Sequence, residues 1–263
     1  MIVDLRENGG GAPAMVGYLV SAFTPKNANI YNVFHSRNGT ESEAPDIYYA
    51  RPRLDIPVYV LISARTGSAA EGFAYTMKAA KRATIVGEAS GGAANPGDRV
   101  PLGDGWSVFV SSGSPVNPVT GGNWEGGGVQ PDVIVPAAEA LDRARLLALE
   151  ALLVKASAGP TTTDSQWALE ALKAELNPLA SIGGLDAYVE TYNGDLVVKR
   201  VGVALVMQRG LRPSSVLVPL GGGLFFVKGE PSRRVAFEKD AMGNVIALNL
   251  ISPGGPSARF RPD

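Results

Sequence analysis

The 263-residue sequence contains no cysteine, only one histidine and no long apolar run. Without cysteine there can be no disulfide framework, no thiol nucleophile and no zinc–thiolate site. One histidine without clustered acidic residues also argues against a zinc site, so we expect no metal and no cofactor. The formal net charge of −1 gives no reason to expect nucleic acid as a partner. No apolar stretch approaches the ~18 residues that a membrane-spanning helix needs, so we expect no membrane span.

A serine lies where a predicted strand gives way to a predicted helix. The β-branched run at residues 58–62 predicts a buried strand, and residues 72–80 predict a helix. At such a junction the hydroxyl of Ser68 is exposed, and the free amides of the helix N-terminus face any oxyanion formed there. The alternative interpretation is that Ser68 only caps the helix, with Glu71 as its capping-box partner.

Glycine-rich loops separate the other predicted elements of the first half of the chain. A strand at residues 1–6 leads to Gly9, Gly10 and Gly11, and a helix is predicted at residues 14–23. The three glycines suit a phosphate loop, an oxyanion hole or a plain flexible turn, but the Lys-Ser/Thr ending of a phosphate loop is missing. Further strands are expected at residues 84–88, 106–110 and 133–136, glycine-rich loops at 89–97 and 117–132, and a helix at 137–156.

A short stretch of small and polar residues predicts a domain boundary. Residues 157–163 form the expected linker between a core at residues 1–156 and a small C-terminal domain at residues 164–263. In that domain Asp164 is expected to cap a helix that ends near Leu176. The remainder alternates in the manner of an antiparallel β-meander without a recognisable catalytic constellation, so its role stays open. Its strands are expected at residues 195–201, 216–220, 224–227, 233–238 and 245–250.

Four segments, taken in their order and spacing, carry a family resemblance. They are Asp4-Leu5-Arg6-x-Asn8-Gly9-Gly10-Gly11, Thr66-x-Ser68-Ala69-Ala70-Glu71, residues 82–88 with the Gly-Gly loop that follows, and Asn123-Trp124-Glu125-Gly126-x-Gly128-Val129-x-Pro131-Asp132. In this combination residues 1–150 resemble the tail-specific, or C-terminal processing, serine peptidases. The resemblance is strongest to the branch with the tricorn core protease and the repeats of interphotoreceptor retinoid-binding protein. It implies an α/β fold with a ClpP/crotonase-like spiral β-sheet core and flanking helices, followed here by a small mainly-β domain.

The resemblance also assigns roles to individual residues. Ser68 takes the place of the nucleophile, and the amide of Ala69 provides one donor of the oxyanion hole. A glycine of the first loop, Gly9 or Gly10, provides the other donor. Glu125 matches the acidic member of the tricorn-type relay, in which a carboxylate orients and stabilises a histidine. The expected reaction is attack of the serine hydroxyl on a peptide carbonyl, with two amides stabilising the tetrahedral oxyanion.

The general base of the family has no match in this sequence. Tail-specific members place a lysine where Ala93 stands here, and the histidine of the tricorn branch would lie before Met1. The single histidine, His35, lies in a strand predicted at residues 32–37 and does not match that position. A lone histidine on a strand is more often a surface residue than a base. Asn95 stands where many retinoid-binding-protein-like members have a histidine. We therefore expect an N-terminally incomplete core with little turnover by itself.

The sequence favours a serine endopeptidase that acts on polypeptides, but other functions are compatible with the same fold. The main alternative is a non-catalytic binding module for apolar ligands or peptides, as in the retinoid-binding repeats. An acyl-CoA enzyme of the crotonase kind is disfavoured by an exposed nucleophilic serine. An interaction protein that works through residues 164–263 is a fourth alternative. The resemblance alone places the protein in the periplasm or outside the cell, and the oligomeric state is left open.

Overall fold

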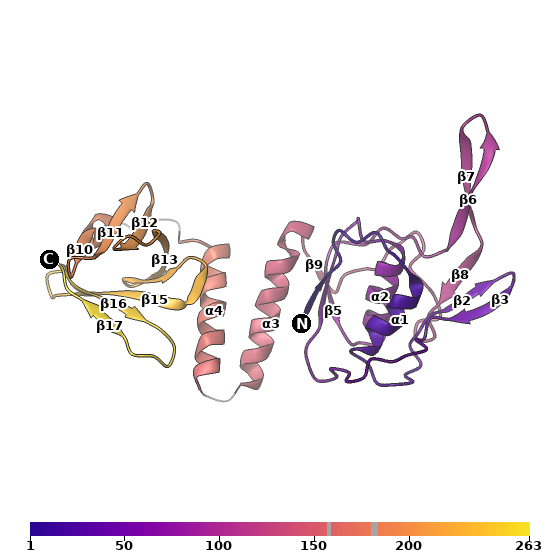
Figure 1. The fold of residues 1–263 in the computed structure, drawn as a ribbon, viewed down its shortest axis with the longest axis horizontal. Helices are drawn as coiled ribbons and strands as arrows, with labels where there is room; N and C mark the ends of the chain where they lie inside the picture. The colour runs from indigo at the N-terminus through magenta and orange to yellow at the C-terminus, as the bar shows by residue number, and fades with distance from the viewer. Residues whose placement is uncertain (157–158, 180–183) are drawn as a thin grey trace. The chain divides into compact units, whose positions relative to one another are not determined.

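A computed structural model describes residues 1–156, 159–179 and 184–263, which form two compact units, Met1–Ala148 and Leu149–Asp263 (Figure 1). The first unit is an α/β core with flanking helices and the second is mainly β, so the predicted fold class is confirmed. Within the described ranges, no helix is both long enough and apolar enough to cross a membrane.

The boundary between the units differs from the one that the sequence predicts. The division falls at Ala148, within helix α3 (Ala140–Lys155). Helix α4 (Pro160–Leu176) ends as predicted but begins before Asp164, so residues 160–163 are its first turn and not a linker. Proline is favoured in the first turn of a helix, where its missing N–H has no helical acceptor, and this explains the early start. Residues 157 and 158 of the predicted linker lie outside the described residues.

A parallel sheet forms the centre of the first unit. Its strands follow the order β1-β4-β5-β9, and each neighbouring pair runs parallel. Their bounds are β1 (Ile2–Asp4), β4 (Tyr59–Ile62), β5 (Thr84–Gly87) and β9 (Val133–Ile134). Strand β4 is completely buried, as its β-branched sequence predicts, because both faces of a parallel sheet are covered.

Helices cover both faces of this sheet. Val60 and Ile62 of β4 belong to an apolar cluster with residues of α1 (Pro13–Ser21) and α2 (Ser68–Ala79). The alternate residues Tyr59 and Leu61 pack on the other face with residues at the start of α3. The predicted helix at 137–156 appears as a short 3₁₀ turn, η1 (Ala137–Glu139), followed by α3. Since the C-terminal ends of parallel strands share one edge, the loops after β1, β4 and β5 meet there.

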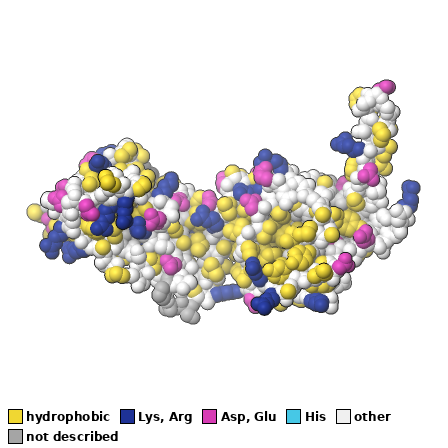
Figure 2. Space-filling model, viewed as in Figure 1, with side chains coloured by type: hydrophobic (Ala, Val, Ile, Leu, Met, Phe, Trp, Pro, Cys, Tyr) yellow, Lys and Arg dark blue, Asp and Glu magenta, His cyan; other side chains and the backbone are white. Residues whose placement is uncertain are grey.

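Two further β-structures extend the first unit. A small sheet has the order β3-β2-β8, and a hairpin is formed by β6 and β7. Their bounds are β2 (Val33–Ser36), β3 (Gly39–Ser42), β6 (Gly97–Gly103), β7 (Trp106–Ser111) and β8 (Gly113–Val116). The hairpin projects away from the sheet and carries exposed apolar side chains (Figures 1 and 2). Strand β7 was predicted, whereas β3, β6 and β8 were not.

The second unit is an eight-stranded antiparallel meander beside α4. Its strands follow one another in chain order, and a bridge between Tyr192 and Pro262 joins the first strand to the end of the chain. They are β10 (Glu190–Tyr192), β11 (Leu196–Val201), β12 (Ala204–Arg209), β13 (Ser215–Gly221), β14 (Leu224–Val227), β15 (Glu230–Lys239), β16 (Val245–Ile251) and β17 (Ala258–Phe260). The predicted meander is thus confirmed, with β10, β12 and β17 added. The short helix η2 (Leu185–Tyr188) precedes the meander. The aromatic ring of its last residue, Tyr188, packs inside the meander with the rings of Phe225 and Phe237.

Candidate active site

Ser68 lies at the sharp turn between β4 and α2, as the sequence predicts. The residue is exposed, and its backbone has a φ of 50°, in the left-handed region that residues other than glycine rarely adopt. Its hydroxyl has no hydrogen-bond partner among the described residues. The N-cap position of α2 is occupied by Gly67 and not by Ser68. The interpretation of Ser68 as a capping hydroxyl is therefore wrong. A strained serine with a free hydroxyl at a strand-to-helix turn is typical of a nucleophile.

The buried carboxylate of Glu71 holds this turn in place. Its Oε2 accepts the backbone N–H of Ser68 at 2.8 Å, which is half of the predicted capping box. Oε2 also accepts the amide of Ala93 at 2.9 Å, while Oε1 accepts the Ser90 hydroxyl at 2.5 Å and the amide of Gly92 at 2.6 Å. Glu71 is fully buried, so these four donors together satisfy a charge that water cannot reach. The sequence showed only the local bond and not the link to the second glycine-rich loop.

The first glycine loop approaches Ser68 very closely. A Cβ built on Gly10 would lie 2.7 Å from the Cβ of Ser68, and its φ of 120° suits glycine alone. Gly9 lies one residue back, where its carbonyl packs against Gly67. The amide of Gly10 donates to the Asn8 side chain at 3.0 Å, so an oxyanion would have to replace that acceptor. Ala69 follows Ser68 in the first turn of α2, whose amides precede the helical hydrogen-bond pattern.

Glu125 contacts the second glycine-rich loop and not Ser68 itself. It is exposed, and its Oε2 accepts the backbone amides of Ala94 and Asn95, both at 2.8 Å. The neighbouring Trp124 is buried against the first turns of α2. The segment that carries Glu125 is therefore fixed beside the Ser68 turn, while its carboxylate is occupied by loop amides.

A pocket of about 190 Å³ opens at Ser68. Ala69 and Ala93 line it, so the position where the resemblance implies a lysine carries no amine. Asn95 and Trp124 also line it, and their Oδ1 and Nε1 atoms are buried without a hydrogen-bond partner among the described residues. An unpaired buried polar atom costs about 1–3 kcal/mol, and most buried polar atoms in native structures have a hydrogen-bond partner.

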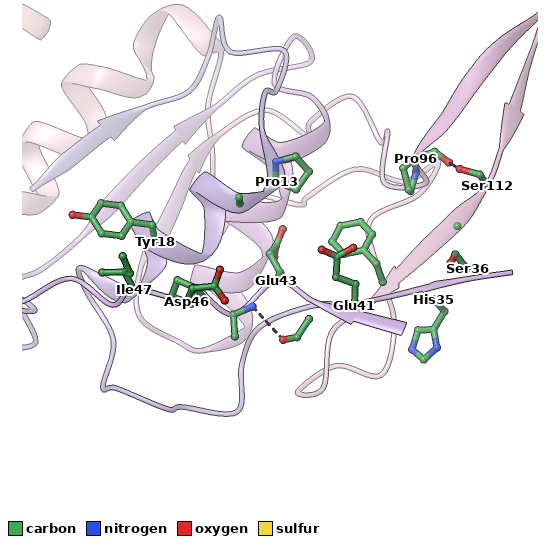
Figure 3. Close-up of a pocket in the computed structure, with 16 residues that line it drawn as sticks. Pro13, Tyr18, His35, Ser36, Glu41, Glu43, Asp46, Ile47, Pro96 and Ser112 are labelled. Carbon is green, nitrogen blue, oxygen red and sulfur yellow. Dashed lines mark hydrogen bonds between the residues drawn. The ribbon is translucent and has the colours of Figure 1, made fainter. Parts of the chain in front are cut away.

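A larger cavity of about 740 Å³ adjoins this pocket (Figure 3). Glu43 lines both and is the only acid or base in the wall of the smaller one, as far as the structure describes the chain. Burial raises the pKa of Glu43 to about 7, although the Asn32 amide donates to its Oε2 at 2.7 Å. His35 lines the larger cavity, but its ring points away from the acidic side chains in Figure 3. The sequence predicts that His35 is not the general base, and its position in the structure is compatible with that prediction.

Glu43 and its partners are the site residues that sequence reasoning missed. Asn32 is fully buried, donates to both Glu43 and Thr76, and accepts the Asn117 amide at 2.9 Å. These residues are far apart in the chain, so no local motif identifies them. The weak signal available was an acidic residue, Glu43, just before the apolar stretch Ala44-Pro45.

Comparison with protein families identifies the first half of the chain. Residues 1–135 match Peptidase family S41. Among solved structures, the chain is similar to the photosystem II D1 C-terminal processing protease, with 24% identity and a TM-score of 0.42. It is also similar to a lipoprotein from Streptococcus agalactiae, with 20% identity and a TM-score of 0.43. These similarities cover 56% and 57% of this chain but only 38% of the protease and 54% of the lipoprotein. Both TM-scores are below 0.5, so the family assignment rests on residues 1–135.

Proposed function

The chain belongs to peptidase family S41, and on this premise we propose that it cleaves polypeptides with Ser68 as the nucleophile. The observation that carries this proposal is the exposed, strained Ser68 at the start of α2, beside a pocket with unpaired polar atoms. In the proposed reaction the hydroxyl oxygen attacks the carbonyl carbon of a peptide bond. The general base takes the hydroxyl proton and passes it to the leaving amine, the acyl group stays on Ser68, and water then releases the acid.

Two backbone amides would stabilise the oxyanion of this step. The amide of Ala69 is proposed as one donor, because it follows the nucleophile at the N-terminus of α2. Gly10, with Gly9 beside it, is proposed as the source of the other, because its backbone lies against Ser68. Rotation of the Asn8 side chain would free the Gly10 amide. Each donor of this kind contributes about 2.7–4 kcal/mol to lowering the barrier.

The proposed general base is a histidine supplied from outside residues 1–263 and oriented by Glu125. Within the described residues, the wall of the Ser68 pocket holds neither a lysine nor a histidine. Glu125 would have to exchange a loop amide for the imidazole N–H. Without that base the chain would bind substrate and turn over slowly. By resemblance, the proposal places the protein in the periplasm or outside the cell.

One observation favours a second candidate function, a non-catalytic module that binds peptides or apolar ligands. The Ser68 hydroxyl has no acceptor among the described residues, and Ala93 occupies the lysine position. A serine without a base is a poor nucleophile at neutral pH. The two functions differ in whether Ser68 can be activated.

Labelling with a fluorophosphonate, in buffer with and without imidazole, distinguishes them. Imidazole in solution stands in for the proposed histidine, so we expect labelling of Ser68, located by peptide mass, to rise with imidazole concentration. Ser68→Ala should abolish it. Ser107→Ala removes an exposed hydroxyl on β7 and should leave it unchanged. If a folded chain is not labelled at Ser68 at any imidazole concentration, the peptidase proposal is refuted and the binding module is favoured.

A further inference from the structure

We propose that the larger cavity beside Ser68 binds a cationic side chain, lysine or arginine, of the polypeptide substrate, and that Glu43 selects it. The polypeptide nature of the ligand rests on the proposed function. The choice of a cationic side chain rests on the shape and charge of the cavity.

Glu43 lies where the two cavities meet. Pro13, Phe34, Glu43 and Pro96 line both the Ser68 pocket and the larger cavity. A polypeptide with its carbonyl at Ser68 can therefore place a neighbouring side chain past Glu43. In Figure 3, the carboxylates of Glu41 and Asp46 flank that of Glu43. A ligand in the larger cavity thus meets three carboxylates, of which one is buried.

Glu43 is held rigidly, with one oxygen left free. Its backbone N–H donates to the Asn32 carbonyl at 2.8 Å, and the Asn32 side chain donates to Oε2 at 2.7 Å. Asn32 is itself fixed by Thr76 and by Asn117. The Oε1 atom has no hydrogen-bond partner among the described residues, although Glu43 is only 7% exposed. Glu43 lines both cavities, and an oxygen of a largely buried side chain that is fixed in place without a donor is a preformed acceptor for a ligand.

Gly72 of α2 lies beside this oxygen. A Cβ at Gly72 would lie 3.5 Å from Oε1 of Glu43 and 3.4 Å from the ring of Trp124. Gly72 is one turn after Ser68 on the same face of α2. The free oxygen therefore lies on the side of α2 that carries the nucleophile.

The walls of the cavity suit a long side chain with a positive end. Tyr18, Phe34 and Ile47 offer apolar surface for the methylene groups of lysine or arginine. No lysine or arginine lines either cavity in the part of the chain that the structure describes. A charge-assisted bond from an ammonium or guanidinium group would satisfy Oε1. An acidic side chain would meet the carboxyl groups of Glu41, Glu43 and Asp46, and an apolar one would leave Oε1 unpaired.

Calorimetric titration of the Ser68→Ala chain with matched peptides tests this proposal without requiring turnover. The peptides are uncharged at both ends, rich in alanine, and carry one central lysine, norleucine, arginine or citrulline. Each pair differs in charge at nearly constant shape. We expect lysine and arginine peptides to bind roughly ten- to a hundredfold more tightly than their neutral partners.

Two further variants assign the preference to Glu43. Glu43→Gln keeps the acceptor for Asn32 and should reduce the preference to within about twofold. Glu139→Gln changes an exposed carboxylate outside both cavities and should leave it intact. Circular dichroism checks that each variant is folded.

The outcomes separate this inference from the proposed function. Equal affinity for charged and neutral peptides, preference for norleucine, absence of binding, or a preference that survives Glu43→Gln would each overturn the inference. Fluorophosphonate labelling of Ser68 would still stand in those cases. A lysine preference that depends on Glu43 would support the inference even if Ser68 cannot be labelled.

Discussion

Replacing Glu43 by glutamine should stabilise the first unit, and the gain should depend on pH. Burial raises the pKa of Glu43 from its ordinary 4.5 to about 7. Between these values the folded chain keeps a proton that the unfolded chain has lost, so stability falls as pH rises through this window. At 1.36 kcal/mol per pH unit, the shift corresponds to about 3 kcal/mol of destabilisation above pH 7. Glutamine has no charge to bury and keeps the bond from Asn32.

Urea denaturation at pH 5 and pH 8 measures this effect. Trp124 is buried close to Glu43 and reports the first unit, once Trp106 and Trp167 are replaced by phenylalanine. We expect Glu43→Gln to gain about 1 kcal/mol or less at pH 5 and about 3 kcal/mol at pH 8. Other groups that titrate in this range are common to both proteins and cancel in the comparison.

An exposed carboxylate provides the control, because it loses no water on folding. Glu139→Gln alters an exposed carboxylate and should change stability by less than about 0.5 kcal/mol at either pH. If Glu43→Gln changes stability equally at pH 5 and pH 8, the carboxyl group is not desolvated and the reasoning is refuted. If the gain appears, the wild-type residue opposes folding, as is typical of a group retained for binding.

Two other substitutions test the packing around the site and the second unit. Gly10→Ala should lower the rate of fluorophosphonate labelling at Ser68 about a hundredfold in a folded chain, because the new Cβ would lie 2.7 Å from that of Ser68. Gly127→Ala, where a Cβ meets nothing within 4 Å, is its control, and equal rates would contradict the prediction. Arg234→Ala should destabilise the second unit by about 3 kcal/mol. The buried guanidinium donates to the Trp167 carbonyl at 2.8 Å, and its Cζ lies 4.9 Å from the centroid of the Trp167 indole ring. Arg234→Met keeps the apolar stem and should cost clearly less by Trp167 fluorescence; an equal cost would show that packing contributes nothing.

Short-range patterns in the sequence determined the elements that carry the site. The β-branched run before Ser68 and the small residues after it require a buried strand, a tight turn and a helix, and these are β4 and α2. The alternating residues of the second half required antiparallel strands, which form the meander. The sequence does not predict strand β6, because Asp98, Arg99 and Pro101 interrupt the alternation of apolar and polar residues and the strand is largely exposed. Its partner β7 and not its own sequence specifies it.

Only the tertiary structure decided which polar groups act together. Four donors converge on Glu71, three of them from residues 90–93, and no spacing in the sequence announces this. Glu43 acquires its raised pKa and its free oxygen because the packing of α2 and Asn32 around it removes water. Local propensity depends on neighbours in the chain and can be derived from the sequence. Desolvation and hydrogen-bond geometry depend on neighbours in space, which exist only after the chain has folded.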